Sequence, residues 1–267
     1  MIETVFSAIA ACCIIGPYRL KIRQYDCENK KIPASFSGKT ILFVSDLHCG
    51  KHFTLGRAKG LVKRINLLNP DIVVFGGDYI NRGNKMAADL FRELKEVDAK
   101  IAKFGVLGNH DYEHAEREVK KGMRDAGIKM LDGRGYWIKM GGEKIRIGGT
   151  VDQSSGNGSG IAKALEGSSV KDFRVLVSHN PAFADEITPG SVDLMLSGHT
   201  HGAGQFPPFG LVGALLPSGF GARYCRKVIS RNGADIFISS GVGTVHLPLR
   251  LMSAPEIVVL TLKSASE

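Results

Sequence analysis

Short apolar runs alternate with amphipathic stretches from residue 40 to the C-terminal end of the sequence. Runs of this length, bounded by glycine and polar residues, are typical of strands buried in a sheet. Because strands and helical stretches follow each other along the chain, the pattern predicts an α/β fold. We expect strands at residues 41–45, 71–76, 103–107, 144–147, 174–178, 192–197, 236–239 and 257–262.

Three of the amphipathic stretches are expected to be helices. The first covers residues 54–68, where apolar residues recur every three or four positions and Thr54 can cap the N-terminus. The others cover residues 86–100 and 112–126, and the last ends at Gly127. No linker or repeat interrupts the pattern, so we treat residues 36–267 as one domain.

The N-terminus has a different pattern. Residues 4–15 are apolar and uncharged, but they are too few to span a bilayer as a helix, which needs about 20 residues. Basic residues follow them, and such flanks favour the cytoplasmic side of a membrane. We interpret residues 1–35 as a candidate membrane-surface anchor, on a cytoplasmic protein that is peripheral on the inner face of the cytoplasmic membrane. The alternative is a helix that packs on the domain.

Composition and charge narrow the class of protein. The chain has 267 residues, of which 43% are hydrophobic and 23% charged, which excludes a disordered or multi-span membrane chain. Its net charge of +9 favours polyanionic partners, such as nucleic acid, anionic lipid or phosphorylated substrates. The cysteines show no paired spacing, and we expect reduced thiols.

Candidate chemistry gathers where the predicted strands end. Five strands are followed by Asp, His or Asn beside glycine or serine. Since ligands bind at the carboxyl ends of strands in α/β sheets, these side chains are expected to meet. Burying so many carboxylates and imidazoles is unfavourable unless a cation is paired with them. The segments are residues 45–48, 76–78, 108–111, 178–180 and 198–201.

The kinds of side chain indicate which metal would bind. Two carboxylates, one amide and four imidazoles suit Mn²⁺, Fe or Zn²⁺. Seven side chains are more than one ion can use while keeping an open position. Two ions that share a carboxylate, about 3.5–4 Å apart, would form a hydrolase site in which water attacks phosphorus.

These segments resemble the calcineurin-like metallophosphoesterases. The matching motifs are DLH (46–48), GGD (76–78), GNHD (108–111), SHNP (178–181) and GHTH (198–201), in this order. The segments GPY (16–18), GVGT (241–244) and APEI (254–257) resemble the bacterial, often membrane-associated, branch. The resemblance implies a four-layer αββα sandwich of two mixed sheets and two divalent metal ions, with Mn²⁺ expected first.

The resemblance also assigns roles to the metal-binding residues by motif position, with Asp78 bridging both ions. The ligands of the first ion would be Asp46, His48 and His201. The ligands of the second would be Asn109, His179 and His199.

Two further residues would act beside the metals. His110 would stabilise the phosphoryl oxygens or protonate the leaving group, and Asp111 would orient its imidazole. The helix that begins near Tyr112 would direct its positive end at the phosphate. Cys49, where the family commonly has a larger aliphatic residue, is expected to be a packing residue.

Substrate contacts are less constrained by the sequence. The Gly- and Pro-rich stretch 202–225 carries Phe206 and Phe209, which either hold acyl chains or pack under the second sheet. Arg250 is a candidate phosphate contact, and the alternative for it is an ion pair with Glu256.

We therefore expect hydrolysis of a phosphodiester or diphosphate bond in a lipid-linked substrate such as UDP-2,3-diacylglucosamine, an intermediate of lipid A synthesis. The first alternative is a general phosphodiesterase or nuclease. Few aromatic residues are available for stacking on bases, which disfavours nucleic acid as the partner. The second alternative, a non-catalytic binding module, is disfavoured by the complete ligand set.

Overall fold

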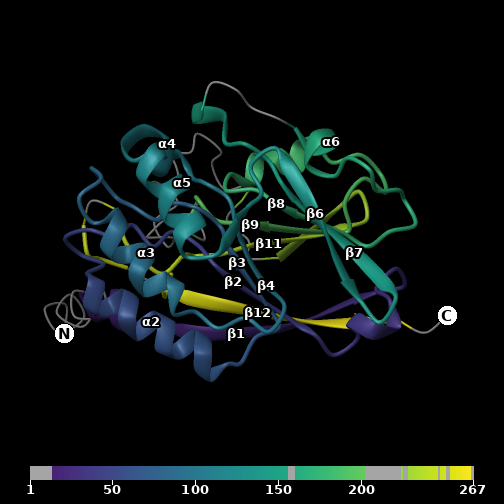
Figure 1. Ribbon diagram of the computed structural model, residues 1–267, viewed down its shortest axis with the longest axis horizontal. Coiled ribbons are helices and arrows are strands. Elements are labelled where there is room, and N and C mark those ends of the chain that lie inside the picture. Colours follow the sequence, from purple (N-terminus) through teal and green to yellow (C-terminus); the bar gives the residue numbers. More distant parts are fainter. Residues whose placement is uncertain are drawn as a thin grey trace, which may run out of the picture.

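Two six-stranded mixed sheets lie face to face, with helices on their outer faces (Figure 1). The computed structural model describes residues 14–155, 160–201, 224, 228–245, 247–250 and 253–265. The first sheet has the order β1-β12-β2-β3-β4-β5 and the second the order β10-β11-β9-β8-β7-β6. The expected α/β fold of two mixed sheets is confirmed.

Each sheet combines parallel and antiparallel pairs. In the first sheet β12 runs antiparallel to β2, and the other neighbours are parallel. Its strands are β1 (Lys21–Asn29), β2 (Thr40–Val44), β3 (Ile72–Phe75), β4 (Ala102–Gly105), β5 (Ile128–Met130) and β12 (Glu256–Ser264). The strands of the second are β6 (Arg134–Met140), β7 (Glu143–Gly149), β8 (Arg174–Val177), β9 (Leu194–Ser197), β10 (Val228–Arg231) and β11 (Ala234–Ile238).

The helices cover the two outer faces. In Figure 1, α2, α3, α4 and α5 lie on one side of the molecule, and α6 lies away from them beside the second sheet. The α-helices are α2 (Leu55–Leu67), α3 (Ala87–Lys95), α4 (Asn109–His114), α5 (Glu116–Asp125) and α6 (Ile161–Ala164). The 3-10 helices are η1 (Gly16–Tyr18), η2 (Ala34–Phe36), η3 (Gln153–Ser155) and η4 (Pro181–Glu186).

Three hydrophobic cores correspond to the spaces between four layers. Alternate residues of a strand point to opposite faces, so Ile41 and Phe43 pack between the sheets while Leu42 and Val44 pack against the helices. Helices α2, α3 and α5 complete that outer core. The third core lies between the second sheet and the elements α6 and η4.

The register of the first sheet brings three strand ends level with each other. Val44 pairs with Phe75, and Phe75 pairs with Gly105, at or next to the last residues of β2, β3 and β4. The polar segments that follow these strands therefore leave the sheet at the same edge. At the opposite end, the Lys31 ammonium lies 2.7 Å from the Asp193 carboxylate and connects the two sheets.

All eight expected strands are present, but β1, β5, β6 and β10 were missed. β1 is an edge strand whose side chains are mostly exposed, so it lacks the apolar run that reveals a buried strand. It pairs in parallel with β12 along its whole length, from Lys21 to Asn29. Residues 21–29 of the segment expected at 1–35 thus belong to the sheet.

The helix expected at 112–126 is also corrected. It begins earlier, at Asn109, and it is interrupted at Ala115, whose backbone has φ −156° and ψ 30°. The helix expected at 86–100 ends at Lys95. Within the described residues no helix is long and apolar enough to cross a bilayer.

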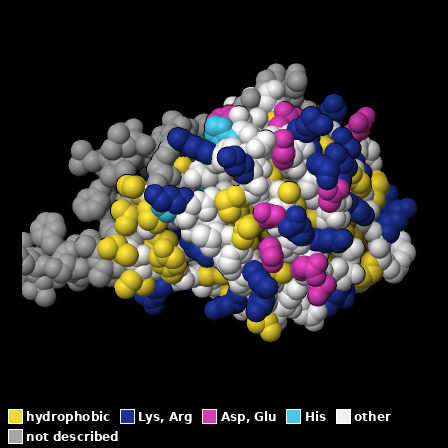
Figure 2. Space-filling model, turned by 60° about the vertical axis from the view of Figure 1, so that its left-hand side comes forward, with side chains coloured by type: hydrophobic (Ala, Val, Ile, Leu, Met, Phe, Trp, Pro, Cys, Tyr) yellow, Lys and Arg dark blue, Asp and Glu magenta, His cyan; other side chains and the backbone are white. Residues whose placement is uncertain are grey.

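Part of the N-terminal apolar run lies outside the described residues, as do Phe206 and Phe209. The run's last two residues, Ile14 and Ile15, are described and are more than half exposed. Figure 2 brings the left-hand end of Figure 1 forward and shows hydrophobic side chains gathered on this end, with Lys and Arg side chains around them.

Candidate metal centre

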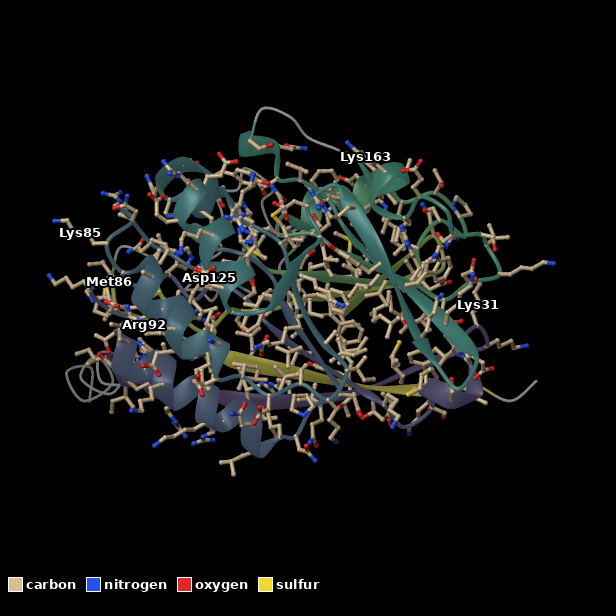
Figure 3. The ribbon with its side chains drawn as sticks, viewed as in Figure 1. Lys31, Lys85, Met86, Arg92, Asp125 and Lys163 are labelled. Atoms are coloured by element: carbon tan, nitrogen blue, oxygen red, sulfur yellow. The ribbon has the colours of Figure 1, made fainter. Side chains whose placement is uncertain are left out.

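The polar segments at the strand ends meet in one site, as the sequence predicts. Asp46 and His48 follow β2, Asp78 follows β3, and Asn109 lies at the start of α4, after β4. The second sheet contributes His179 after β8, and His199 and His201 after β9. Figure 3 shows how side chains from both sheets fill the region between them.

One group of donors comes from Asp46, His48 and His201. The two Nε2 atoms of His48 and His201 lie 3.2 Å apart. The Asp46 carboxylate oxygen is 4.0 Å from His48 Nε2 and 3.8 Å from His201 Nε2. All three side chains are buried, and their donor atoms could together hold one metal ion.

A second group comes from Asn109, His179 and His199. Asn109 Oδ1 lies 3.2 Å from His179 Nε2 and 3.0 Å from His199 Nδ1, and the two nitrogens are 3.3 Å apart. His179 Nδ1 lies 2.7 Å from the Gly76 carbonyl oxygen, which can only accept. Nδ1 therefore carries a proton, and Nε2 faces its two neighbours together with the Asp78 carboxylate, which raises the pKa of His179 above its usual value although burial acts in the opposite direction.

The Asp78 carboxylate lies between the two groups. Its Oδ2 is 3.4 Å from His48 Nε2 and 3.3 Å from His179 Nε2. Its Oδ1 accepts a hydrogen bond of 3.0 Å from the backbone N–H of His110. The first turn of α4 therefore donates to this carboxylate, whereas the sequence suggested that it would face a phosphate.

The backbone around these residues is strained. A positive φ is uncommon for residues other than glycine, and backbone strain of this kind clusters at active sites. Five candidate ligands nevertheless have φ between 47° and 67°. They are Asp46, His48, Asp78, His199 and His201.

Burial and close contact set the protonation of the site. Burial lowers the pKa of His48 to about 3 and that of His199 to about 4, so both imidazoles are neutral at pH 7. Burial raises the pKa of Asp46 to about 6, although the Ser45 hydroxyl and the His199 N–H donate to it. Burial also acts to raise the pKa of Asp78, but the neighbouring His179 and His48 lower it, and the pKa stays below the usual value.

This donor set fits divalent metal ions. Imidazole nitrogens, carboxylate oxygens and an amide oxygen converge here at distances of 3.0–3.4 Å. Such contacts are repulsive unless protons or cations lie among them. The types of donor match those of borderline transition-metal sites.

His110 is next to the donors and is partly exposed. Its ring centroid is 4.8 Å from that of His48, and one of its ring nitrogens lies within 4.8 Å of the donor atoms of His48 and Asp78. Its Nδ1 lies 2.8 Å from the Asn81 carbonyl oxygen and must carry the ring proton there. The other nitrogen, Nε2, takes no part in this hydrogen bond.

Asp111 does not orient His110. Its carboxylate is fully buried and accepts hydrogen bonds from the backbone N–H groups of Ile80 and Gly108. It stabilises the loop and the start of α4, and the carbonyl of Asn81 orients the imidazole instead. The sequence gave no sign of Asn81, because its contribution comes from the backbone.

Arg250 is not a surface phosphate contact. It is 2% exposed, and its guanidinium donates to the carbonyl oxygens of Ser240 at 2.8 Å and Ser253 at 2.9 Å. It also donates to the Gly243 carbonyl, and one nitrogen lies 3.2 Å from His201 Nδ1. Arg250 therefore holds three backbone carbonyls, from two segments, against the back of a candidate ligand.

Cys49 is a free, buried thiol, and burial raises its pKa to about 11. An inert thiol of this kind packs, as the sequence suggested.

Comparison with known proteins identifies the family. The profile of calcineurin-like phosphoesterases matches residues 39–203. The chain is 31% identical to the uncharacterized metallophosphoesterase YkuE of Bacillus subtilis, over 94% of this chain and 88% of that protein. It is 28% identical to a transmembrane protein with metallophosphoesterase domain of Danio rerio, over 92% of this chain and 58% of that protein.

Solved structures support the fold. The NAD nucleotidase of Haemophilus influenzae superposes with a TM-score of 0.54 at 16% identity, over 77% of this chain and 45% of that chain. A 5'-nucleotidase precursor of Thermus thermophilus superposes with a TM-score of 0.51 at 15% identity, over 77% of this chain and 49% of that chain. With the family match and the donor cluster, these findings show that the chain belongs to the calcineurin-like phosphoesterase family and is a metallophosphoesterase, a hydrolase of a family that uses divalent metal ions.

Proposed function

We propose that the protein binds two divalent ions, Mn²⁺ first among them, and hydrolyses a phosphodiester or diphosphate bond in a lipid-linked substrate. Asp78 would contact both ions. The observation that supports this most is the position of its Oδ2, 3.4 Å from His48 Nε2 and 3.3 Å from His179 Nε2. The remaining ligands would divide into Asp46, His48 and His201 for one ion and Asn109, His179 and His199 for the other.

When bound, two such ions polarise the phosphoryl oxygens and lower the pKa of an attacking water. The protein keeps these ligands in place before any substrate arrives. The Gly76 carbonyl orients His179, and the His110 N–H orients Asp78. Short side chains on a rigid backbone suit a reaction that needs fixed distances.

His110 would handle the proton of the leaving group. Its Nδ1–H is held by the Asn81 carbonyl, so Nε2 is the atom that can carry a second proton to the departing oxygen. As an imidazolium it would also stabilise negative charge on the phosphoryl group. Its partial exposure leaves it accessible to a substrate.

A lipid-linked substrate is supported by the exposed apolar surface near the N-terminal end of the described chain. Ile14, Ile15 and Tyr18 are 55–62% exposed there, and basic residues lie beside them. The Danio rerio relative, whose name describes a transmembrane protein, provides a precedent for this domain at a membrane. We propose a peripheral position on the inner face of the cytoplasmic membrane and UDP-2,3-diacylglucosamine as the first substrate to test.

The test is the release of UMP from UDP-2,3-diacylglucosamine by metal-stripped protein resupplied with Mn²⁺. His110→Ala is the informative variant and His114→Ala its matched control, because His114 is exposed on the same helix and its ring centroid is 5.7 Å from that of His110. We expect release that depends on Mn²⁺, is lost in His110→Ala and is retained in His114→Ala. If no UMP is released from this lipid while bis(p-nitrophenyl) phosphate is still cleaved, this substrate is excluded and a general phosphodiesterase is favoured. Cleavage of neither would contradict the whole proposal.

A further inference from the structure

A cavity of about 550 Å³ lies between the N-terminal end of the described chain and helix α2. Its apolar walls include Leu20, Phe53, Leu61, Val242 and Pro255. Tyr18 lines it together with the basic residues Arg19, Lys21, Arg57 and Arg64.

The cavity has a strong excess of positive charge. Four cations line it and no carboxylate does. No Asp or Glu occurs between Asp46 and Asp71 either, and the carboxylate next to the lining residue Pro255, that of Glu256, is buried and lies 3.8 Å from Arg23. Arg19, Lys21 and Arg64 are exposed, and their side chains make no hydrogen bond or ion pair within the part of the chain that the structure describes. Unpaired cations around an apolar floor suit a ligand that is both anionic and apolar.

Arg57 is the ordered part of this arrangement. Its guanidinium donates to the Pro17 carbonyl at 2.6 Å and to the His52 carbonyl at 2.9 Å. It also lies 5.0 Å from the ring centroids of both Tyr18 and Phe53. These contacts join η1 to α2 and keep a cation in the wall of the cavity without a carboxylate to neutralise it.

An exposed apolar segment, here called the rim, leads into the cavity along the chain. Tyr18, which lines the cavity, is 62% exposed, and Ile14 and Ile15, which precede it by four and three residues, are 58% and 55% exposed. Figure 2 shows hydrophobic side chains gathered at this end among Lys and Arg side chains. A small anion from solution would leave the rim in water, whereas a membrane surface would cover it.

We propose that this cavity binds the phosphate headgroup of an anionic phospholipid and seats the adjacent rim on the membrane surface. The cavity is a separate site from the metal centre, but the two share a wall. Val242 lines the cavity, and its neighbour Gly243 donates from its N–H to the Asp46 carbonyl at 2.7 Å. Membrane binding here would place the metal centre close to the lipid surface.

The experiment measures binding of the full chain to vesicles by flotation. One set of vesicles is pure phosphatidylcholine, and the other is equal parts phosphatidylcholine and phosphatidylglycerol. The variant is Arg19→Gln with Arg64→Gln, both in the cavity wall. The matched control is Lys59→Gln with Lys63→Gln, which removes the same charge from exposed positions of α2 that do not line the cavity.

We expect binding only to the vesicles with phosphatidylglycerol. The arginine pair should weaken it by roughly 10- to 30-fold, because each basic residue near an anionic surface contributes on the order of a factor of five. The lysine pair should weaken vesicle binding less, so that the logarithm of its fold-change is under half that of the arginine pair. Replacing Ile14 and Ile15 with Ser should weaken it further, and unchanged unfolding midpoints would show that all variants fold.

Equal losses in the arginine and lysine pairs would overturn the proposal, since they would indicate diffuse attraction with no role for the cavity. Equal binding to both kinds of vesicle, or binding to a duplex DNA oligonucleotide that the arginine pair abolishes while vesicle binding persists, would also overturn it. Hydrolysis of a water-soluble diester by the unmodified protein is measured separately. If this hydrolysis is absent, the proposed function is contradicted, whereas the conclusion about vesicle binding does not change.

Discussion

The candidate metal centre and the cationic cavity share the segment around Val242, yet they are built in opposite ways. In the centre, short side chains on strained backbone are held by backbone groups, as His179 is by the Gly76 carbonyl. In the cavity, three of the four cations are long, exposed side chains without partners among the described residues. Chemistry at fixed distances needs the first kind of construction, whereas binding to a fluid charged surface needs only the second.

The largest expected effect comes from Asp78→Asn, which keeps the shape of the side chain and removes its charge. Because both ions would depend on this carboxylate, we expect metal content to fall well below one ion per chain and hydrolysis to fall to background. Binding to anionic vesicles should persist, since the cavity does not contain Asp78. Elemental analysis and flotation measure the two outcomes. Loss of vesicle binding with the metal would contradict the separation of the two regions.

His110→Ala should slow hydrolysis by about 10²- to 10⁴-fold, the usual contribution of a general acid. Metal content should be unchanged, because this residue would lie outside the ligand set. Steady-state kinetics and elemental analysis on the same samples distinguish the two roles. A variant that loses an ion would show that His110 is a ligand.

Asp132 tests how far the fixed construction of the metal centre depends on a buried carboxyl group. It accepts hydrogen bonds from the Tyr112 hydroxyl and from the Leu107 N–H, just before Asn109 and His110. Burial raises its pKa to about 6, although these hydrogen bonds act in the opposite direction. Since the ordinary value is about 3.9, the folded state binds this proton more tightly than the unfolded state does. The stabilisation is therefore complete below about pH 4 and is lost as the pH rises through about 6.

Asp132→Asn cannot ionise and should lack this pH dependence. Between about pH 4 and pH 8, we expect the free energy of unfolding of the variant to rise relative to that of the wild type by about 2–3 kcal/mol. Urea unfolding of metal-free protein at both pH values measures it. A constant difference between variant and wild type would show that the carboxyl is not perturbed.

Arg250 connects the two regions and has the smallest expected effect. Its guanidinium faces His201, while its backbone carbonyl lies so close to Gly16 that no side chain would fit there. We expect Arg250→Lys to lower the binding affinity for the ion nearest His201 by about 10- to 100-fold, as for other residues that support a metal ligand. Metal titration monitored by calorimetry would show one weakened site and one unchanged site. Equal weakening of both would indicate a general loss of structure.

The sequence predicted the centre better than its surroundings, for physical reasons. Donor residues at strand ends are visible because glycine and buried apolar runs surround them. The carbonyl of Asn81 leaves no trace in the side-chain sequence, and nothing marked Arg250 as buried. The cavity was not predicted because Arg19 and Arg64 are far apart in the chain, and each alone resembles an ordinary surface charge. The edge strand β1 was missed because only one of its residues, Cys27, is buried.

The number of metal ions per chain tests the central claim most directly. The full-length protein would be stripped of metal, resupplied with Mn²⁺, freed of excess ion and measured by elemental analysis against protein concentration. Two ions per chain is the result that a carboxylate shared by two groups of ligands predicts. One ion per chain, or none, would contradict a centre in which Asp78 joins two metals.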